Sequence, residues 1–494
     1  MRASALTALS YAFIATPYLL ALLLGLVVPT LGVLCFTRFG AGLVVVVGMF
    51  AIEALYMFVG GISLGVSLYY TDIALVFVFA VGTLRLLSAR ERAPLQRAWW
   101  VFAAVVALSL VSGLANYGAA AGVQARPYFY FVAAALYGLS FRMDDRRVGA
   151  SLNALAALAV LLIGITVFRW IVYYLPVPEL LPAEGAYNND GPIRVVRSHE
   201  ALVLAQVWVV SLFFGRAAPG LRVLRALSPV LLALVLVLQH RSVWVATLAG
   251  VLTALATMLG GRRRRGSAVV QALIFAAIVG VTVVPMLASD QFSGVGAQIT
   301  SSAGTALTTQ GSAGERLDSW KEIVNHWAAG GARSILIGQS FGTDPSRFVR
   351  DPSGALRRIE YTAHNMYVQT LFNTGLVGLG AFLLAAGGVL RGLFRICAGA
   401  GSHAASHAAG NAAPPVTAQA LLVLVVMQLV YYVPYGTDYL QSLIFAVAVS
   451  YVASQATRGA GAREAREAGE ADEADLPRNA AGKNARRAPR WGTA

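Results

Sequence analysis

A histidine that can carry a proton stands where a long polar loop gives way to an apolar segment. This residue, His364, lies in the run YTAHNMYVQ at 361–369, and the glycine-rich apolar segment 374–380 follows it. Histidine is the side chain whose charge changes near neutral pH, so it can act as a general base. The sequence therefore predicts that the chemistry of the protein takes place at this junction.

The composition indicates what must position this histidine. The chain has 494 residues, of which 57% are hydrophobic and only 12% are charged, which is about half the charged fraction of an ordinary soluble domain. Apolar runs such as 19–28, 43–49 and 155–167 belong to segments long enough to cross about 30 Å of hydrocarbon. Only helices and closed barrels satisfy their backbone groups there, and these runs lack the alternation of barrel strands. We therefore predict an all-α fold, that of a polytopic helical membrane protein.

The apolar segments divide the chain into four regions. We expect about 12 to 14 transmembrane helices, because residues 1–36 have room for two short ones, and we interpret this stretch as a first span rather than a cleaved signal. The regions are N-terminal transmembrane helices at 1–288, one structured external loop at 289–364, C-terminal transmembrane helices at 365–455, and a disordered cytoplasmic tail at 456–494. The candidate spans are roughly 17–36, 41–59, 71–88, 98–116, 124–140, 148–172, 199–215, 225–240, 242–260, 267–288, 365–390, 417–434 and 438–455.

Arginines alternate with the apolar segments in a way that predicts the orientation of the chain. Every second connection is rich in arginine, for example 90–97, 142–147, 216–225 and 262–265, and by the positive-inside rule these connections face the cytoplasm. The net charge of +15 therefore needs no nucleic acid to explain it. The two cysteines, Cys35 and Cys397, fall near these ends and form neither a disulfide framework nor a CxxC metal motif.

Two connections on the opposite side nevertheless carry basic residues. Residues 173–198 hold Arg194 and Arg197, and the long loop 289–363 holds seven basic residues, among them Arg316. A long loop is translocated whatever its charge. These arginines are therefore candidates for a functional role rather than topology signals.

Part of the long loop has the pattern of an amphipathic helix. Apolar residues recur at 317, 320, 323–324 and 327, and a short apolar run at 334–337 then ends at Gly338. We expect a small helix on the outer surface, before the loop that carries His364, which covers a membrane-embedded cleft as a lid does.

Three motifs, in this order, resemble the O-antigen ligase and O-antigen polymerase family of bacterial inner-membrane glycosyltransferases. The first is QHRSVW at 239–244, with Arg241 at the external start of a span. The second is the helix with Arg316 and the turn at 338–342, and the third is HNMYVQ at 364–369 with GLVG at 375–378. The resemblance covers about residues 230–390. In the first half of the chain it extends only to hydropathy, and the loop with Arg194 and Arg197 departs from the family's Arg-Ser/Thr-Gly pattern.

The resemblance implies a donor glycan linked through diphosphate to a polyprenyl lipid, and an acceptor that is lipid A-core or another lipid-linked glycan. Guanidinium groups can hold two phosphate oxygens at once and stabilise the charge that develops as the glycan leaves. Arg241 is then the strongest candidate for binding the diphosphate, followed by Arg197, Arg194 and Arg316, and His364 is the catalytic base. No acidic metal-binding cluster stands out, so we expect transfer without metal or cofactor. The protein would lie in the inner membrane with its active site facing the periplasm.

The same residues also have simpler structural interpretations. His364 could be only an interfacial hydrogen-bond partner, Arg241 could reach towards lipid headgroups, and Arg316 could pair with an acidic residue of its own helix. Among other polar residues near span ends, Arg169 is expected to anchor the interface and Glu53 has no evident partner. The remaining ones are His199 and Glu200 as secondary site candidates, His240 as a packed interfacial residue and His326 as a solvated one.

Three functions fit this pattern to different degrees. A ligase would move a finished glycan onto lipid A-core, and we favour it slightly because one compact external loop suffices for a single acceptor. A polymerase would move a growing chain onto another lipid-linked repeat unit. A transporter or flippase for lipid-linked oligosaccharide would require charged residues near the midplane and paired broken helices. The basic exceptions are mostly external, so a glycosyltransferase is the leading interpretation.

Overall fold

The fold consists almost entirely of helices. The computed structural model describes residues 26–56, 61–63, 67–88, 94–174, 195–259, 273, 275–277, 312–350, 356–359, 363–399 and 416–474. Within these residues seven helices are long and apolar enough to cross a membrane, or up to nine if each of two bent pairs is counted as one span. The predicted all-α polytopic membrane protein is therefore confirmed. Part of the predicted span 17–36 and nearly all of 267–288 lie outside the described residues, so the total of 12 to 14 stays a prediction.

The N-terminal part contains long helices that pass back and forth. The helix Leu26–Thr37 meets α2 at an angle of 118°, with Arg38 at the bend. A small antiparallel hairpin follows α2, an element that the all-α prediction did not include. The elements are α2 (Phe39–Tyr56), β1 (Gly61–Ser63), β2 (Ser67–Tyr69), α3 (Tyr70–Ser88), α4 (Pro94–Tyr117), α5 (Ala119–Leu139) and α6 (Asp145–Tyr174).

The middle part contains the central helix of the molecule. Every residue of α7 from Glu200 to Phe214 is buried, which explains why its sequence is apolar all round. The predicted span 225–240 contains all of α9 but only the last two residues of α8, and these two helices meet at 75°. Pro229, at the start of α9, has no backbone N–H to continue the hydrogen bonds of α8. The elements are α7 (Ser198–Phe214), η2 (Gly215–Ala217), α8 (Pro219–Ala226), α9 (Ser228–Val237) and α10 (Arg241–Leu259).

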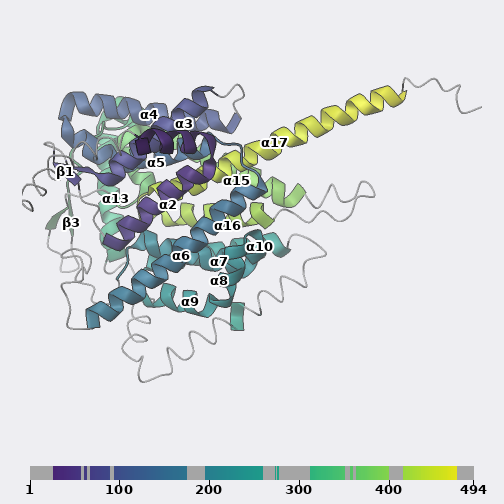
Figure 1. Ribbon diagram of the computed structural model, residues 1–494. Helices are drawn as coiled ribbons and strands as arrows, with labels where there is room; N and C mark the ends of the chain where they lie inside the picture. The colour runs from purple at the N-terminus through teal and green to yellow at the C-terminus, as the bar shows by residue number, and fades with distance from the viewer. Residues whose placement is uncertain are drawn as a thin grey trace, which may run out of the picture.

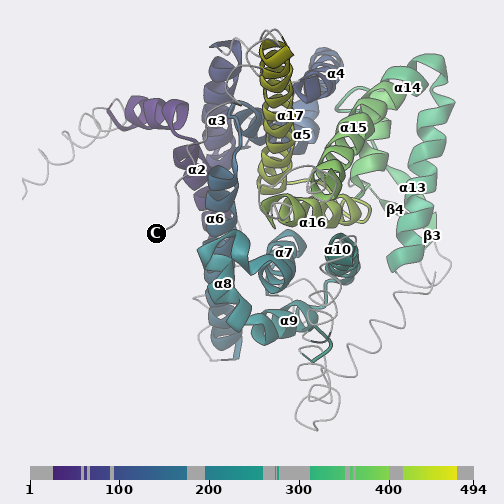
Figure 2. The same ribbon diagram turned by 90° about the vertical axis from the view of Figure 1, so that its right-hand side faces the viewer.

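The C-terminal part combines a folded external segment with three long helices. The amphipathic pattern at 315–327 forms α13 as predicted, and a second antiparallel hairpin, β3–β4, follows it. Figure 2 shows α13, α14 and this hairpin together on one flank, beside α15. The elements are α13 (Ser312–Ala329), α14 (Gly331–Ile337), β3 (Arg347–Arg350), β4 (Leu356–Ile359), α15 (Met366–Gly399), α16 (Val416–Tyr431) and α17 (Tyr439–Ala474).

Two glycines allow the external segment to touch α15 backbone to backbone. Gly375 has φ 64° within α15 and produces a kink there, and Gly338 has φ 80° at the end of α14. A Cβ on Gly375 would lie 2.4 Å from the backbone of Leu336, and one on Gly338 would lie 2.4 Å from the nitrogen of Thr374. Neither the backbone conformation nor the space admits a side chain. These two glycines therefore fix the external segment against the start of α15.

The helix ends fall into two groups at opposite ends of the molecule. At the arginine-rich end, the guanidinium of Arg85 lies over the rings of Phe36 and Phe141, at 5.3 and 3.8 Å from their centroids. At the other end, Glu53 accepts a hydrogen bond from Tyr439, which joins the end of α2 to the start of α17. Figure 1 shows β1, β3 and α13 at this second end, while the C-terminal part of α17 projects from the first.

The helix α17 extends into the region that the sequence predicts to be a disordered tail. It continues to Ala474, and residues 475–494 lie outside the described residues. The segment 462–474 is rich in Ala, Glu and Arg, which have high helix propensities. A helix that is already formed therefore continues through it, although the segment has no apolar face to bury.

Candidate functional site

The turn before α15 presents His364 in a fixed position. His364 has φ 46°, the left-handed region that residues other than glycine rarely adopt. The side chain of Asn365 caps α15 by accepting hydrogen bonds from the backbone N–H groups of Tyr367 (2.9 Å) and Val368 (3.0 Å). On the other side, the carbonyl of Ala363 accepts a hydrogen bond from the indole of Trp320 on α13 (2.7 Å). His364 is thus held from α13 and α15 at once, and its side chain is exposed.

Tyr435 lies beside both His364 and Arg316. The ring of His364 meets the ring of Tyr435 edge-on, with 6.5 Å between centroids. The guanidinium of Arg316, on α13, lies over the same ring at 5.2 Å and donates a hydrogen bond to the carbonyl of Pro434 (3.2 Å). Arg316 therefore turns towards the loop between α16 and α17, and no ion pair joins it to an acidic residue of α13 among the described residues. The predicted base and one predicted arginine are brought together.

The surroundings of His364 favour its neutral form. Desolvation by the protein, followed by the positive charges of Arg316 and Arg347, lowers the pKa of His364 below its ordinary value. Arg347 is buried and donates a hydrogen bond to Ser319 on α13 (2.6 Å). A neutral imidazole at pH 7 can accept a proton, so desolvation and the two positive charges together favour the form of His364 that a general base requires.

Arg241 opens α10 at the same end of the molecule. Its Nε atom is buried and has no hydrogen-bond partner among the described residues. The residue two positions earlier, Gln239, has φ 51°. Between them, His240 donates from Nε2 to the carbonyl of Val196 (3.0 Å), which ties the start of α10 to the segment before α7. The Arg241 guanidinium therefore carries a donor that the described protein groups do not use.

Arg197 is paired with an acidic residue from a distant helix. Its Nη1 lies 3.1 Å from a carboxylate oxygen of Glu53 at the end of α2, and Glu53 also accepts a hydrogen bond from Tyr439 (2.8 Å). The backbone N–H of Arg197 donates to the carboxylate of Glu200 (2.8 Å), which is buried in the first turn of α7. Glu53 thus has the arginine partner that the sequence left open. Arg194 lies outside the described residues.

Two tyrosines join these groups into one site. The hydroxyl of Tyr431, at the end of α16, is hydrogen-bonded to Ser198 (2.7 Å), next to Arg197. Its ring stacks on the ring of Tyr435 with 5.0 Å between centroids. The backbone N–H of Met366, two residues after His364, donates to the carbonyls of Tyr432 and Tyr435. A continuous chain of contacts therefore runs from Arg197 to Arg316 and His364.

Arg169 has a structural role that differs from the expected interfacial anchoring. Its side chain is only 1% exposed, and it donates hydrogen bonds to the carbonyls of Val195 (2.7 Å) and Ala54. A buried guanidinium is stable only when such acceptors replace water. Arg169 therefore connects α6 to the end of α2 and to the segment that leads into Arg197.

The sequence analysis missed several residues of this site. Tyr431 and Tyr435 lie in an apolar segment where tyrosine is common at membrane interfaces, so they gave no separate signal. Arg347 appeared only as one of seven basic residues of the external loop. His326 was expected to be solvated, and it is exposed, but its ring also packs edge-on against Phe372 at 5.6 Å. Which of these side chains face the site depends on contacts between distant segments.

A comparison with known families gives a match for the part of the chain that contains most of these site residues. Residues 226–383 match the family model described as O-antigen ligase. This region is similar to the O-antigen ligase family. It contains Arg241, Arg316 and His364, whereas Arg197 and Arg194 precede it. A comparison with curated proteins found no match.

The O-antigen ligase match also supports a general function for this multi-pass membrane protein, which is glycan transfer in the assembly of O-antigen or a related polysaccharide. Lipid-linked glycans in a membrane are the substrates that this family implies. The predicted resemblance, made from motifs over 230–390, is confirmed by a match that ends within ten residues of it at each side.

Proposed function

We propose that the protein is an inner-membrane glycosyltransferase that moves a glycan from a polyprenyl-diphosphate carrier to an acceptor sugar on the periplasmic side. The observation that supports this best is the meeting of two motifs of the matched region, with Arg316 and His364 around Tyr435. The third motif, with Arg241, begins a helix at the same end of the molecule. Cationic groups beside a neutral base are what transfer from a diphosphate ester needs. The most favoured reaction is that of an O-antigen ligase acting on lipid A-core.

The arginines would stabilise the leaving group. In the transfer, the bond between the anomeric carbon and the diphosphate oxygen breaks, and its electron pair stays on that oxygen. Arg241 has an Nε donor that no described residue uses and stands in the first turn of α10, where the helix dipole also favours an anion. Arg316 adds a second charge. Arg197 is already neutralised by Glu53, so we rank it after Arg241.

The histidine would activate the acceptor. The hydroxyl oxygen of the acceptor sugar forms the new bond to the anomeric carbon, and its proton passes to a ring nitrogen of His364. Direct attack opposite to the diphosphate inverts the anomeric configuration. Because desolvation, together with the charges of Arg316 and Arg347, lowers the pKa of His364, the base form is available at pH 7. We propose that no metal ion takes part.

Transfer by purified protein tests the proposal and separates ligase from polymerase. The assay combines the protein, a polyprenyl-diphosphate oligosaccharide and lipid A-core in the presence of EDTA. Glycan on lipid A-core supports a ligase that needs no metal. Longer lipid-linked chains without such a product would assign a polymerase instead. Folded protein that gives neither product would contradict the glycosyltransferase, and movement of intact donor across vesicles would then favour a transporter.

Replacing Arg241 with lysine tests the diphosphate assignment. A lysine keeps the charge but cannot hold two phosphate oxygens in a fork. We expect Arg241→Lys to reduce kcat/KM for transfer by about tenfold to a hundredfold, as the loss of one charge-assisted hydrogen bond does. Arg222→Lys, an exposed arginine of α8 at the opposite end, is the matched control. Unchanged kcat/KM in Arg241→Lys would remove Arg241 from the site.

A further inference from the structure

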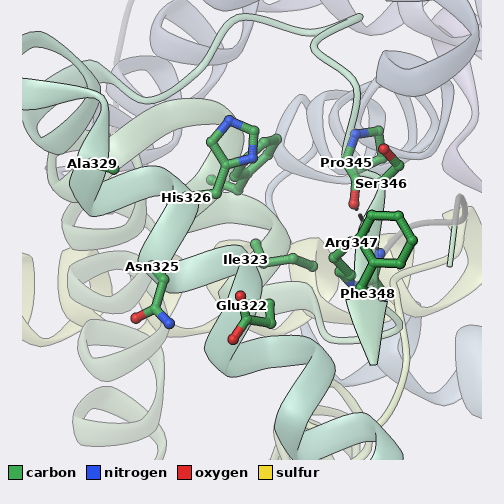
Figure 3. Close-up of a pocket in the computed structure, with 10 residues that line it drawn as sticks. Glu322, Ile323, Asn325, His326, Ala329, Pro345, Ser346, Arg347 and Phe348 are labelled. Atoms are coloured by element: carbon green, nitrogen blue, oxygen red, sulfur yellow. Dashed lines mark hydrogen bonds between the residues drawn. The ribbon is translucent and has the colours of Figure 1, made fainter. Parts of the chain in front are cut away.

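A hollow opens in the external segment, separate from the groups around Tyr435. It has a volume of about 410 Å³ and lies between α13, the start of β3 and Phe372 of α15. Figure 3 shows its two walls, with Ile323 and His326 on α13 facing Ser346 and Phe348 on the strand side. This volume falls within the range of about 300–1,000 Å³ that is typical of ligand sites.

The hollow adjoins the turn that carries His364. Ile323 and Phe372 line it, and both pack with Ala363 in one apolar cluster. Ala363 directly precedes His364 and is also held by the indole of Trp320 from α13. A ligand in this hollow would therefore contact the same elements that position the proposed base.

The lining combines an exposed aromatic ring with polar side chains that can form hydrogen bonds. Phe348 is 62% exposed, although an aromatic ring of this size is usually buried. Around it stand an amide, an imidazole and a hydroxyl, from Asn325, His326 and Ser346. Such groups can both donate and accept hydrogen bonds. A ligand with an apolar face and many hydroxyl groups matches this combination.

The charges of the lining do not favour an anion. Glu322 contributes a carboxylate to the wall, which would repel a phosphate. The guanidinium of Arg347 is engaged by Ser319 (2.6 Å) and by the carbonyl of Pro345 (3.1 Å). The hollow therefore differs in chemistry from the cationic groups around Arg241 and Arg316.

The rim of the hollow is held in shape before any ligand binds. The carboxylate of Asp344 accepts hydrogen bonds from the backbone N–H (2.9 Å) and the hydroxyl (2.8 Å) of Ser346. These hydrogen bonds lower the pKa of Asp344, so it stays ionised, and Arg358 on β4 pairs with it at 3.7 Å. Such preorganisation reduces the entropy lost on binding.

We propose that this hollow is a saccharide subsite that binds neutral sugar residues of one substrate glycan. Another residue of the same glycan, or the other substrate of the transfer, reacts at His364 at the same time. The inference rests on the proposed glycosyltransferase function and assigns to this hollow the part of the substrate that lies away from the reacting bond. The ring of Phe348 covers the apolar face of a sugar, and Asn325, His326 and Glu322 bind its hydroxyl groups. The sugar belongs either to the donor or to the acceptor.

The test compares variants of the two walls in the full-length protein. Phe348→Ala removes the ring and Asn325→Ala removes the amide, while Phe348→Tyr keeps an aromatic face. Leu317→Ala is the matched control, since Leu317 is exposed on α13 and is not part of the lining. For each variant, KM and kcat are measured with the donor varied and then with the acceptor varied. In parallel, saturation-transfer NMR measures binding of two free oligosaccharides, one released from the donor by mild acid and one from lipid A-core.

We expect Phe348→Ala to raise one KM about tenfold, the effect of losing one aromatic contact, with kcat largely kept. Phe348→Tyr should retain the wild-type value. The substrate whose KM rises, and whose free oligosaccharide no longer binds, identifies the source of the sugar. If Phe348→Ala and Asn325→Ala transfer glycan normally, with both KM values and the binding of both oligosaccharides unchanged, the proposed subsite is wrong. The proposed function would not be affected by that result. Wild-type protein that transfers no glycan would overturn the proposed function. The subsite would still be supported in that case if the wild type binds an oligosaccharide and Phe348→Ala does not.

Discussion

The two residues with unusual backbone conformations are both next to the proposed chemistry. Among the described residues, Gln239 and His364 are the only ones other than glycine with positive φ. Such conformations cost about 1–3 kcal/mol each and persist where the surroundings hold them. One precedes the His240–Arg241 pair and the other is the proposed base itself. Both positions lie just before the first residue of a long helix, α10 or α15.

A substitution at His364 must be compatible with its left-handed backbone conformation. Asparagine tolerates the left-handed region but cannot act as a base, so His364→Asn separates catalysis from folding better than alanine does. We expect transfer to fall by a factor of about 10² to 10⁴, the usual contribution of a general base. The measurement is the initial rate with saturating substrates, alongside thermal unfolding in detergent. A variant that unfolds like the wild type and still transfers at the normal rate would exclude the catalytic role.

Arg316 should affect the pH dependence of transfer through His364. Desolvation and the charges of Arg316 and Arg347 lower the pKa of His364, so the neutral form, which we propose to be the active one, persists to lower pH than in an ordinary histidine. Arg316→Gln removes one positive charge, which makes the protonated imidazole less unfavourable and raises the pKa of His364. The acid limb of the rate profile should therefore move to higher pH.

The profile of kcat/KM between pH 4.5 and 8 measures this shift. Lys321→Gln, on the exposed side of the same helix, is the control for a charge that does not act on His364. An acid limb that stays in place in Arg316→Gln would mean that Arg316 does not act on the titrating group.

At the scale of elements, the site depends on how α13, α14 and α15 meet. The glycines Gly338 and Gly375 let α14 touch α15 along the backbone, and Trp320 ties α13 to the residue before His364. The cap residue Asn365 then begins α15. The external segment therefore supports the turn that carries His364, and the predicted lid is packed against the membrane helices.

Loss of the cap should loosen the turn that carries His364. Asn365→Ala leaves two backbone N–H groups of α15 without their acceptor, and we expect a loss of about 1 kcal/mol in the free energy of unfolding. The transfer rate should fall by more than this small loss of stability explains, because the base is no longer held. Asn365→Ser keeps a capping oxygen and should restore both properties. Equal transfer rates in Asn365→Ala and the wild type would show that the cap does not position the base.

At the scale of the whole molecule, the arginine-rich ends and the site lie at opposite ends of the helices. Arg85 and Phe141 meet at one end, and Glu53, Arg197 and Tyr439 meet at the other. If the positive-inside rule holds, the site faces the periplasm. Labelling of single cysteines by a membrane-impermeant maleimide in intact cells tests this orientation.

The labelling starts from a chain in which Cys35 and Cys397 are replaced by alanine and serine. Lys321→Cys on α13 should react in cells with a permeable outer membrane, and Arg146→Cys at the start of α6 should react only after lysis, since both positions are exposed. The reverse pattern would contradict the periplasmic site.

The sequence by itself determined the class of the fold and the type of chemistry. Long apolar segments in lipid form helices because the backbone groups must be hydrogen-bonded within the segment. The motifs around Arg241, Arg316 and His364 sufficed to indicate the family, and the match over 226–383 bears this out. These are local properties, because a hydrophobic segment or a short motif carries its information in neighbouring residues. The helical pattern of α13 was visible for the same reason.

Only the tertiary structure decided which side chains meet. The pairing of Arg197 with Glu53 joins residues 144 positions apart in the chain, and the contact of Arg316 with the loop before α17 spans 118. Burial of Arg169 also depended on how the helices pack. Hydropathy and residue spacing indicate that a helix forms. They do not indicate how the helix is rotated about its axis or which elements it packs against. The partners of a charged side chain are set by that packing.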